Sequence, residues 1–180
     1  EMSFLDTGLC WVNTSPHIPE CDTPFYYATT GIIGELGLLH IGIGYTMPFK
    51  LIAQTYIDPK KFCMTLNAHK LQGVKFQPIS YKPFYGSQKN TLIHGAKIHI
   101  LDTKIYKPVK TCYTILSVIK SLYPKELKKS IAKTSQSQRN LFNKANGTNN
   151  VFQLLQKKGS IAHSLINFHK NEREVFLQKR

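Results

Sequence analysis

Hydrophobic positions recur at two different periods along this chain of 180 residues. In two short segments, residues 74–79 and 96–101, they alternate every second position, which is typical of strands that bury one face. From residue 108 onward they recur every three or four positions, which is typical of amphipathic helices. The pattern predicts a mixed α/β (α+β) fold, with a small sheet packed by helices and a last third that is all helical.

Two strands are predicted within the alternating region. The first covers Val74 to Ile79, and Pro78 has no N–H to donate to a neighbouring strand, so we expect this strand at an edge of the sheet. The second covers residues 96–101 and has one clearly apolar face. The polar connection between them, residues 84–95, has a length that is usually functional or mobile.

Proline residues mark the expected starts of the earlier helices. Pro24 is expected to begin a short helix, because proline fits the first turn and apolar residues follow at helical spacing. Asp58 is expected to cap a second helix that begins at Pro59 and reaches about Lys70. Phe62 and Leu66 would then face the core.

The last third is predicted to hold several helices. One covers residues 108–123, and a short basic helix follows over residues 125–133. Residues 134–150 are polar and rich in turn formers, so we expect a loop there, anchored by Leu141 and Phe142. Ser160 is expected to cap a long final helix. Its apolar positions are Ile161, Leu165, Phe168, Val175 and Phe176.

The stretch from Gly31 to Phe49 follows neither period. It is dense in glycine, almost uncharged, and contains one carboxylate, Glu35. Glycine lets backbone approach backbone or ligand where a Cβ would clash, so a crowded, irregular turn is expected rather than a plain strand or helix. We interpret this stretch as one wall of a pocket, in which burial could raise the pKa of Glu35.

The same stretch resembles a segment of the NamZ-type exo-β-N-acetylmuramidases, peptidoglycan hydrolases long described as a domain of unknown function. That segment contains a glutamate followed by Gly-x-Gly-Thr-x-x-Pro-Phe. Here the matching positions are Glu35, Gly42, Gly44, Pro48 and Phe49. Other blocks resemble the family in the same order, at residues 8–19, 73–83, 95–111 and 147–148. Such an ordered series is much more specific than any one block.

Two positions in the glycine-rich segment depart from the family pattern. Ile43 stands where most members carry an arginine, and Tyr45 stands where a threonine follows the second glycine, with Thr46 one place later. An arginine there could pair with a substrate carboxylate. Its loss favours an alternative hypothesis, in which the chain is a non-catalytic module that binds peptidoglycan fragments through a decayed site.

The resemblance implies that residues 1–180 form a single domain, the C-terminal domain of a larger muramidase-like protein. In the family the proposed catalytic carboxylates lie in a preceding Rossmann-like domain, to which nothing in this sequence corresponds. The full-length protein is therefore expected to be a glycoside hydrolase, and this segment alone is expected to be inactive. Its expected partners are peptidoglycan-derived amino sugars and the missing N-terminal domain. The resemblance also implies a periplasmic or exported location.

Hydrolysis of a glycosidic bond normally takes two carboxyl groups, one on either side of the bond. Glu35 is the candidate acid, with a structural hydrogen-bonding role as the alternative, and no second carboxylate is evident. His99 is either a substrate contact or a satisfied surface histidine. The predicted substrate-binding residues are Glu35, Gly42, Gly44, Tyr45, Thr46 and His99. No metal site or cofactor is expected, because the histidines have no ligand cluster and a third glycine for dinucleotide binding is lacking.

Charge is distributed unevenly along the chain. The net charge is +14, but residues 1–58 hold six acids and a single base, Lys50. Basic charge favours anionic partners in general. The composition argues against a dedicated reader of nucleic acid, because only three of the basic residues are arginine. The four cysteines form no Cys-x-x-Cys pair, and no apolar run is long enough to span a bilayer.

Overall fold

A three-stranded antiparallel sheet lies at the centre of the first two thirds of the chain. The computed structural model describes residues 2–157, 159, 161, 164–165, 167–168 and 170–179. The strands are β1 (Leu51–Gln54), β2 (Val74–Tyr81) and β3 (Ile93–Ile100), in the order β1-β3-β2. The edge position predicted for β2 is confirmed, with Pro78 opposite Ala96 of β3. The sequence did not predict β1, which is short and buried along most of its length.

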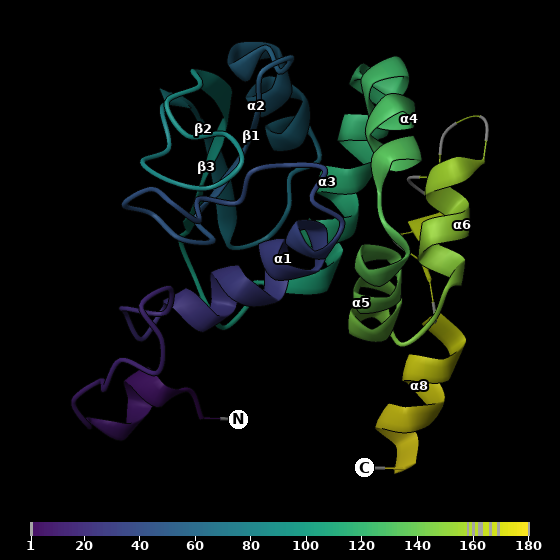
Figure 1. The fold of residues 1–180 in the computed structure, drawn as a ribbon. Helices are drawn as coiled ribbons and strands as arrows, with labels where there is room; N and C mark the ends of the chain where they lie inside the picture. The colour runs from purple at the N-terminus through teal and green to yellow at the C-terminus, as the bar shows by residue number, and fades with distance from the viewer. Residues whose placement is uncertain are drawn as a thin grey trace.

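Three helices cover one face of this sheet. They are α1 (Thr23–Glu35), α2 (Pro59–Ala68) and α3 (Pro108–Leu122). Helix α2 lies directly on β2 and β3, and α3 packs against both α2 and α1 (Figure 1). The strands contribute alternate residues to the core beneath these helices. These are Ile52, Val74, Phe76, Ala96 and Ile98.

The start of α2 follows the local signals in the sequence. The carboxylate of Asp58 accepts a hydrogen bond from the N–H of Lys61 at 3.0 Å, and Pro59 occupies the first turn. Phe62 and Leu66 are fully buried. The expected cap, first turn and inward face are therefore all confirmed.

The last third is helical in its described residues, so the mixed α/β prediction is confirmed. It contains α4 (Pro124–Lys133), α5 (Gln136–Asn146), α6 (Asn150–Gln156) and α8 (Lys170–Lys179). Figure 1 shows α4, α5 and α6 on the side of the molecule away from the sheet.

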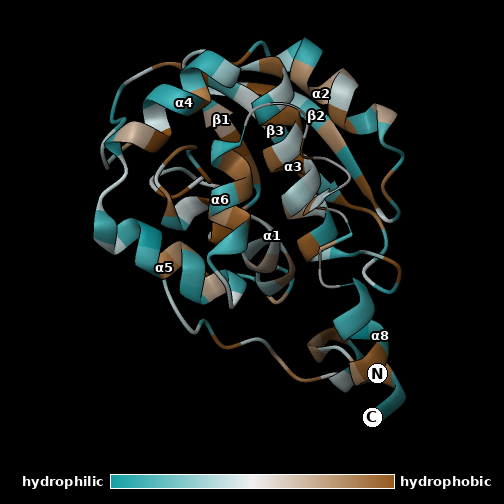
Figure 2. Ribbon diagram, turned by 90° about the vertical axis from the view of Figure 1, so that its right-hand side faces the viewer, coloured by the Kyte–Doolittle hydropathy of each residue, from teal (hydrophilic) through white to brown (hydrophobic). Residues whose placement is uncertain are grey.

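The prediction of a loop over residues 134–150 was wrong, because α5 occupies most of this segment. Ser135 and Gln138 form a reciprocal capping box at the start of α5, and Gly147 ends it in a left-handed conformation. Phe142 is fully buried, as expected for an anchor, whereas Leu141 is about half exposed. Figure 2 shows that α5 is mostly hydrophilic. This polar composition is why the sequence predicted a loop instead of a helix.

The prediction of one long final helix was also wrong over the residues that the structure describes. Residues 167–168 form a turn, and α8 begins only at Lys170. Ile161 and Leu165 are buried, but α8 itself buries no residue, and its Val175 and Phe176 are exposed. The cap expected at Ser160 lies outside the described residues.

The glycine-rich stretch is partly helical, which corrects the expectation of an irregular turn from Gly31 onward. Helix α1 continues through Gly31 and Gly34 to Glu35, and residues 36–50 then follow an irregular path. A Cβ on Gly34 would lie 2.4 Å from the side chain of Ile41. Gly34 therefore lets the helix pack closely against the segment that follows it, without breaking the helix.

The segment before α1 extends away from the core (Figure 1) and contains the short 3₁₀ helix η1 (Phe4–Thr7). Cys10 in this segment is exposed and Cys21 is partly buried, and both are free thiols. Cys63 and Cys112 are free and buried, and burial raises the pKa of the Cys63 thiol to about 12. Among the described residues, no helix is long and apolar enough to cross a membrane.

Candidate functional site

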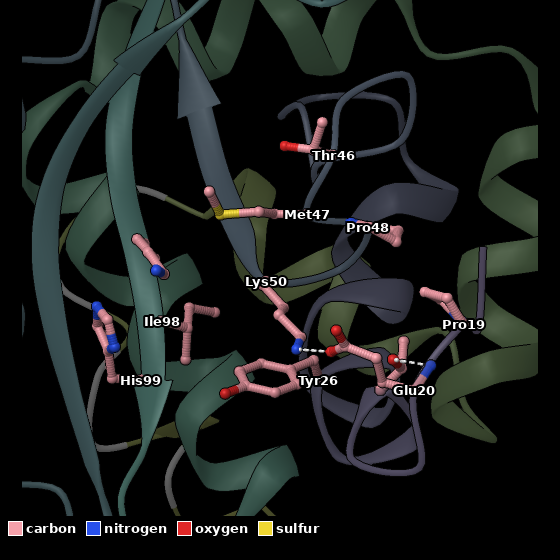
Figure 3. Close-up of a pocket in the computed structure, with 11 residues that line it drawn as sticks. Pro19, Glu20, Tyr26, Thr46, Met47, Pro48, Lys50, Ile98 and His99 are labelled. Atoms are coloured by element: carbon pink, nitrogen blue, oxygen red, sulfur yellow. Dashed lines mark hydrogen bonds and ion pairs between the residues drawn. The ribbon is translucent and has the colours of Figure 1, made fainter. Parts of the chain in front are cut away.

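A pocket of about 330 Å³ lies where three segments distant in sequence meet. The first is the entry to α1 and its first turns, the second is the loop before β1, and the third is the end of β3 (Figure 3). The loop contributes Thr46, Met47 and Pro48, and β3 contributes Lys97 and His99. The pocket therefore combines the glycine-rich stretch with the outer face of the sheet.

The alternation of β3 places Lys97 and His99 on this outer face, while Ala96 and Ile98 join the core. His99 Nε2 lies 2.8 Å from the side-chain oxygen of Gln77 on β2. An amide oxygen only accepts, so Nε2 carries a proton and Nδ1 is left as an acceptor. Burial, together with the charge of Lys97, lowers the pKa of His99. His99 is thus favoured as a neutral imidazole at neutral pH.

Lys50 lines the pocket and points toward Glu20 (Figure 3), and its ammonium is held by two carboxylates. Its Nζ donates to the carboxylate of Glu20 and, at 3.2 Å, to Oδ2 of Asp22. The ammonium also lies 5.1 Å from the centroid of the Tyr26 ring. Burial by itself would lower the pKa of Lys50, but the two carboxylates outweigh it and raise the pKa. The positive charge of Lys50 is therefore already paired.

Replacing Glu20 with glutamine is expected to lower the free energy of unfolding by up to about 1 kcal/mol at pH 7. The hydrogen bond from Lys50 lowers the pKa of Glu20 below its ordinary 4.5. The carboxylate therefore stabilises the fold above about pH 4.5, and this contribution disappears as the pH falls through the lowered pKa. Urea denaturation at neutral and acid pH measures it, with Glu174→Gln on exposed α8 as control. An equal loss at both pH values would contradict the ion pair.

Lys97 is the cation that the pocket leaves unpaired. Within the described part of the chain, its ammonium has no hydrogen bond or ion pair, and its side chain is half-buried. On the same outer face, His99 lies two positions further along β3, and Lys75 of β2 lies opposite His99 and diagonal to Lys97. The pocket therefore presents one free positive charge beside a neutral imidazole, a combination suited to a small anionic or hydroxyl-rich ligand.

The loop that covers the pocket depends on its two glycines. Gly42 and Gly44 have φ values of +86° and +89°. A Cβ on Gly42 would lie 2.1 Å from the carbonyl oxygen of Met47, and one on Gly44 would lie 2.6 Å from that of Tyr85. Both glycines thus allow close backbone approaches that shape the loop.

Aromatic packing fixes the other side of this loop. The Tyr45 ring stacks at 4.5 Å from the ring of Tyr81 on β2 and at 5.5 Å from Phe84. The Tyr81 hydroxyl lies 2.7 Å from Nδ1 of His40, whose pKa is lowered by burial. Tyr45 therefore links the loop to the sheet.

The structure brings two of the predicted site residues, Thr46 and His99, into the pocket. Gly42, Gly44 and Tyr45 lie outside its lining, in the loop that forms it. Glu35 is the last residue of α1, is half-buried, and does not line the pocket. Roles for these four residues in substrate binding remain predictions. No group of three possible metal ligands occurs among the described histidines, cysteines and acids.

Sequence reasoning missed Glu20, Lys50 and Lys97. Two signals could have found the lysines. Lys50 is the sole base in the first 58 residues, and Lys97 precedes His99 by two positions on a predicted strand. The pairing of Lys50 with acids about 30 residues away has no sequence signature.

Comparison with known proteins decides the family. A model of the C-terminal region of the exo-β-N-acetylmuramidase NamZ matches residues 25–180. The chain belongs to this family. It is also 34% identical over 126 residues to the peptidoglycan β-N-acetylmuramidase NamZ of Bacillus subtilis, across 70% of this chain and 30% of that protein. The resemblance inferred from the motifs is thereby confirmed.

A solved structure shares the NamZ C-terminal fold. The crystal structure of a DUF1343 family protein from Bacteroides fragilis matches 99% of this chain and 47% of that one, with a TM-score of 0.86 and 28% identity. The chain thus spans between about a third and a half of these relatives.

Proposed function

We propose that this chain forms one wall of the substrate cleft of a peptidoglycan β-N-acetylmuramidase-like glycoside hydrolase. The catalytic carboxylates would come from a part of a longer polypeptide outside these 180 residues. Family membership supports this function, and so does a pocket that joins the family's glycine-rich segment to Lys97 and His99. The muramidase activity itself belongs, by name, to the Bacillus subtilis relative.

The acids of the pocket are poorly suited to glycoside hydrolysis. A general acid needs a raised pKa so that it holds a proton at working pH. Glu20 has the opposite shift, because Lys50 lowers its pKa, and Asp22 binds the same ammonium. Glu35, the candidate acid from the sequence, lies away from the lining. A role in binding fits the described residues better than a complete catalytic pair.

Lys97 supplies the proposed recognition of substrate. Muramic acid differs from other amino sugars by a lactyl ether that ends in a carboxylate, and the free ammonium of Lys97 can pair with it. His99 Nδ1 and the Thr46 hydroxyl can bind sugar hydroxyls beside it. The expected substrates are therefore peptidoglycan-derived amino sugars that carry this acid.

An assay with a chromogenic muramic acid glycoside tests the proposal. The 180-residue chain alone is expected to show no turnover, whereas the chain joined to the rest of its polypeptide is expected to release N-acetylmuramic acid. In the joined protein, Lys97→Gln should raise KM about tenfold, because a charged hydrogen bond is lost. Lys75→Gln, a lysine on the same face but outside the pocket, is the control. Turnover by the chain alone, or equal effects of the two substitutions, would overturn the proposal.

A non-catalytic binding module is the second candidate. Ile43, which replaces the family's usual arginine, packs against the hydrophobic core, so that position offers no cation to a ligand. Binding of muropeptides by the joined protein without hydrolysis would favour this alternative.

A further inference from the structure

A second and larger pocket, of about 740 Å³, lies among the C-terminal helices. Residues of α3, α4, α5 and α6 line it, together with Lys157, Gly159 and Ile161. It shares no lining residue with the proposed sugar site, so an inference about it does not depend on the proposed function. Figure 1 shows α4 and α6, which flank it, on the side of the molecule away from the sheet.

The walls of this pocket are mainly apolar. Leu127 and Ile131 of α4 face Leu155 of α6 and Ile161 across it, and all four belong to the hydrophobic core. Pockets of several hundred Å³ with apolar walls and a few polar groups are typical of small-molecule sites. The apolar part of a ligand would be stabilised here by removal of its surface from water.

The charged side chains that line this pocket are all positive. They are Lys120, Lys128, Arg139 and Lys157, and no aspartate or glutamate is among the described lining residues. Lys120 is already engaged, because its Nζ donates to the carbonyl oxygens of Leu154 and Leu155 at 2.9 Å each. Lys128, Arg139 and Lys157 therefore carry the charge available to a ligand.

Arg139, which lines this pocket, has a hydrogen-bond donor without a partner among the described residues. Its Nε is buried and lacks a hydrogen-bond partner in the described part of the chain. The guanidinium carbon lies 5.5 Å from the centroid of the Phe152 ring, which restricts the orientation of the side chain. A buried donor without a partner destabilises the folded protein, and the cost is larger for a charged group. An anion in the pocket would offset the cost of burying this positive charge.

From the apolar walls and the unopposed positive charge, we infer that this pocket binds a single-chain anionic amphiphile. The hydrocarbon chain lies against Leu127, Ile131 and Leu155, and a carboxylate or phosphate head group pairs with Arg139 and Lys128. Both parts are required: a small anion lacks the apolar contacts, and a neutral or cationic chain leaves the positive charges of Arg139 and Lys128 without a counter-charge.

A set of probes with the same hydrocarbon chain tests the ligand class. Dodecanoate, dodecyl phosphate, dodecanol and dodecyltrimethylammonium are titrated below their micellar concentrations into the 180-residue chain by calorimetry. The anionic probes are expected to bind at least about tenfold more tightly than dodecanol, since a charged hydrogen bond is gained. The difference between dodecanoate and dodecyl phosphate identifies the preferred head group. Equal affinity for anionic and cationic probes, or no binding, would overturn the inference.

Substitutions then place the ligand in this pocket. Ala132→Trp fills the pocket from an exposed lining position and should abolish dodecanoate binding, whereas Ala145→Trp on α5, outside the lining, should leave it unchanged. Lys128→Gln should weaken dodecanoate binding severalfold without changing dodecanol binding, and Lys129→Gln, its exposed neighbour outside the lining, is the matched control. Unchanged binding in Ala132→Trp would show that the probes bind elsewhere and would contradict the inference.

Discussion

Replacing Phe142 with alanine is expected to lower the free energy of unfolding by about 3–5 kcal/mol. Phe142 is fully buried, and its ring lies 6.3 Å from that of Phe152 on α6, so truncation would leave a cavity between α5 and α6. The amphipathic helix α5 would then lose its one buried side chain among those described. Urea denaturation followed by circular dichroism measures the change.

The neighbouring residue provides a matched control for this substitution. Leu141 precedes Phe142 on α5 but is 47% exposed. Leu141→Ala is expected to cost less than about 1 kcal/mol, because surface substitutions away from the core have small effects. Similar losses for the two variants would mean that Phe142 does not anchor α5 to the core.

Replacing Gly42 with alanine is expected to cost about 3 kcal/mol or more. Two effects combine at this position. The φ of +86° is unfavourable for any residue with a Cβ, and that Cβ would lie 2.1 Å from the carbonyl oxygen of Met47. The loop over the first pocket would have to move, so we expect reduced stability and weaker sugar binding together. Thermal unfolding and ligand titration measure the two losses.

A substitution at Gly86 distinguishes the conformational strain of a positive φ from the steric clash with Met47. Its φ of +89° is nearly the same, but a Cβ there would meet no atom within 4 Å. Gly86→Ala should therefore cost only the conformational strain, about 1 kcal/mol. If Gly42→Ala were no more destabilising than Gly86→Ala, the close approach to Met47 would be unimportant.

The predictable parts of the fold are those in which periodicity and capping agree. Helix α2 combines an aspartate cap, a proline in the first turn and apolar residues on one face, and all three signals proved correct. Strand β1 has only four residues and no polar alternation, so its pattern Leu-Ile-Ala-Gln has no strand signature. Helix α5 has a readable signal in its capping box, Ser135 and Gln138, but its polar composition outweighed that signal.

The candidate site was predictable only where residues could be placed on one element. His99 was placed on a predicted strand, and Thr46 lies one place after the position of the threonine in the family motif; both line the pocket. The ion pair of Lys50 with Glu20 joins the entry of α1 to the start of β1 across 30 residues of sequence. Such pairings depend on the tertiary fold, which local patterns do not encode.

The middle position of β3 in the sheet determines which half of the sugar site can adapt. Lys97 lies opposite Leu51 on one side and Gln77 on the other, so its backbone is fixed by two ladders. Thr46 and Met47, by contrast, belong to an irregular loop outside any strand. Differences in ligand shape are therefore expected to be absorbed by this loop, while the position of Lys97 stays constant.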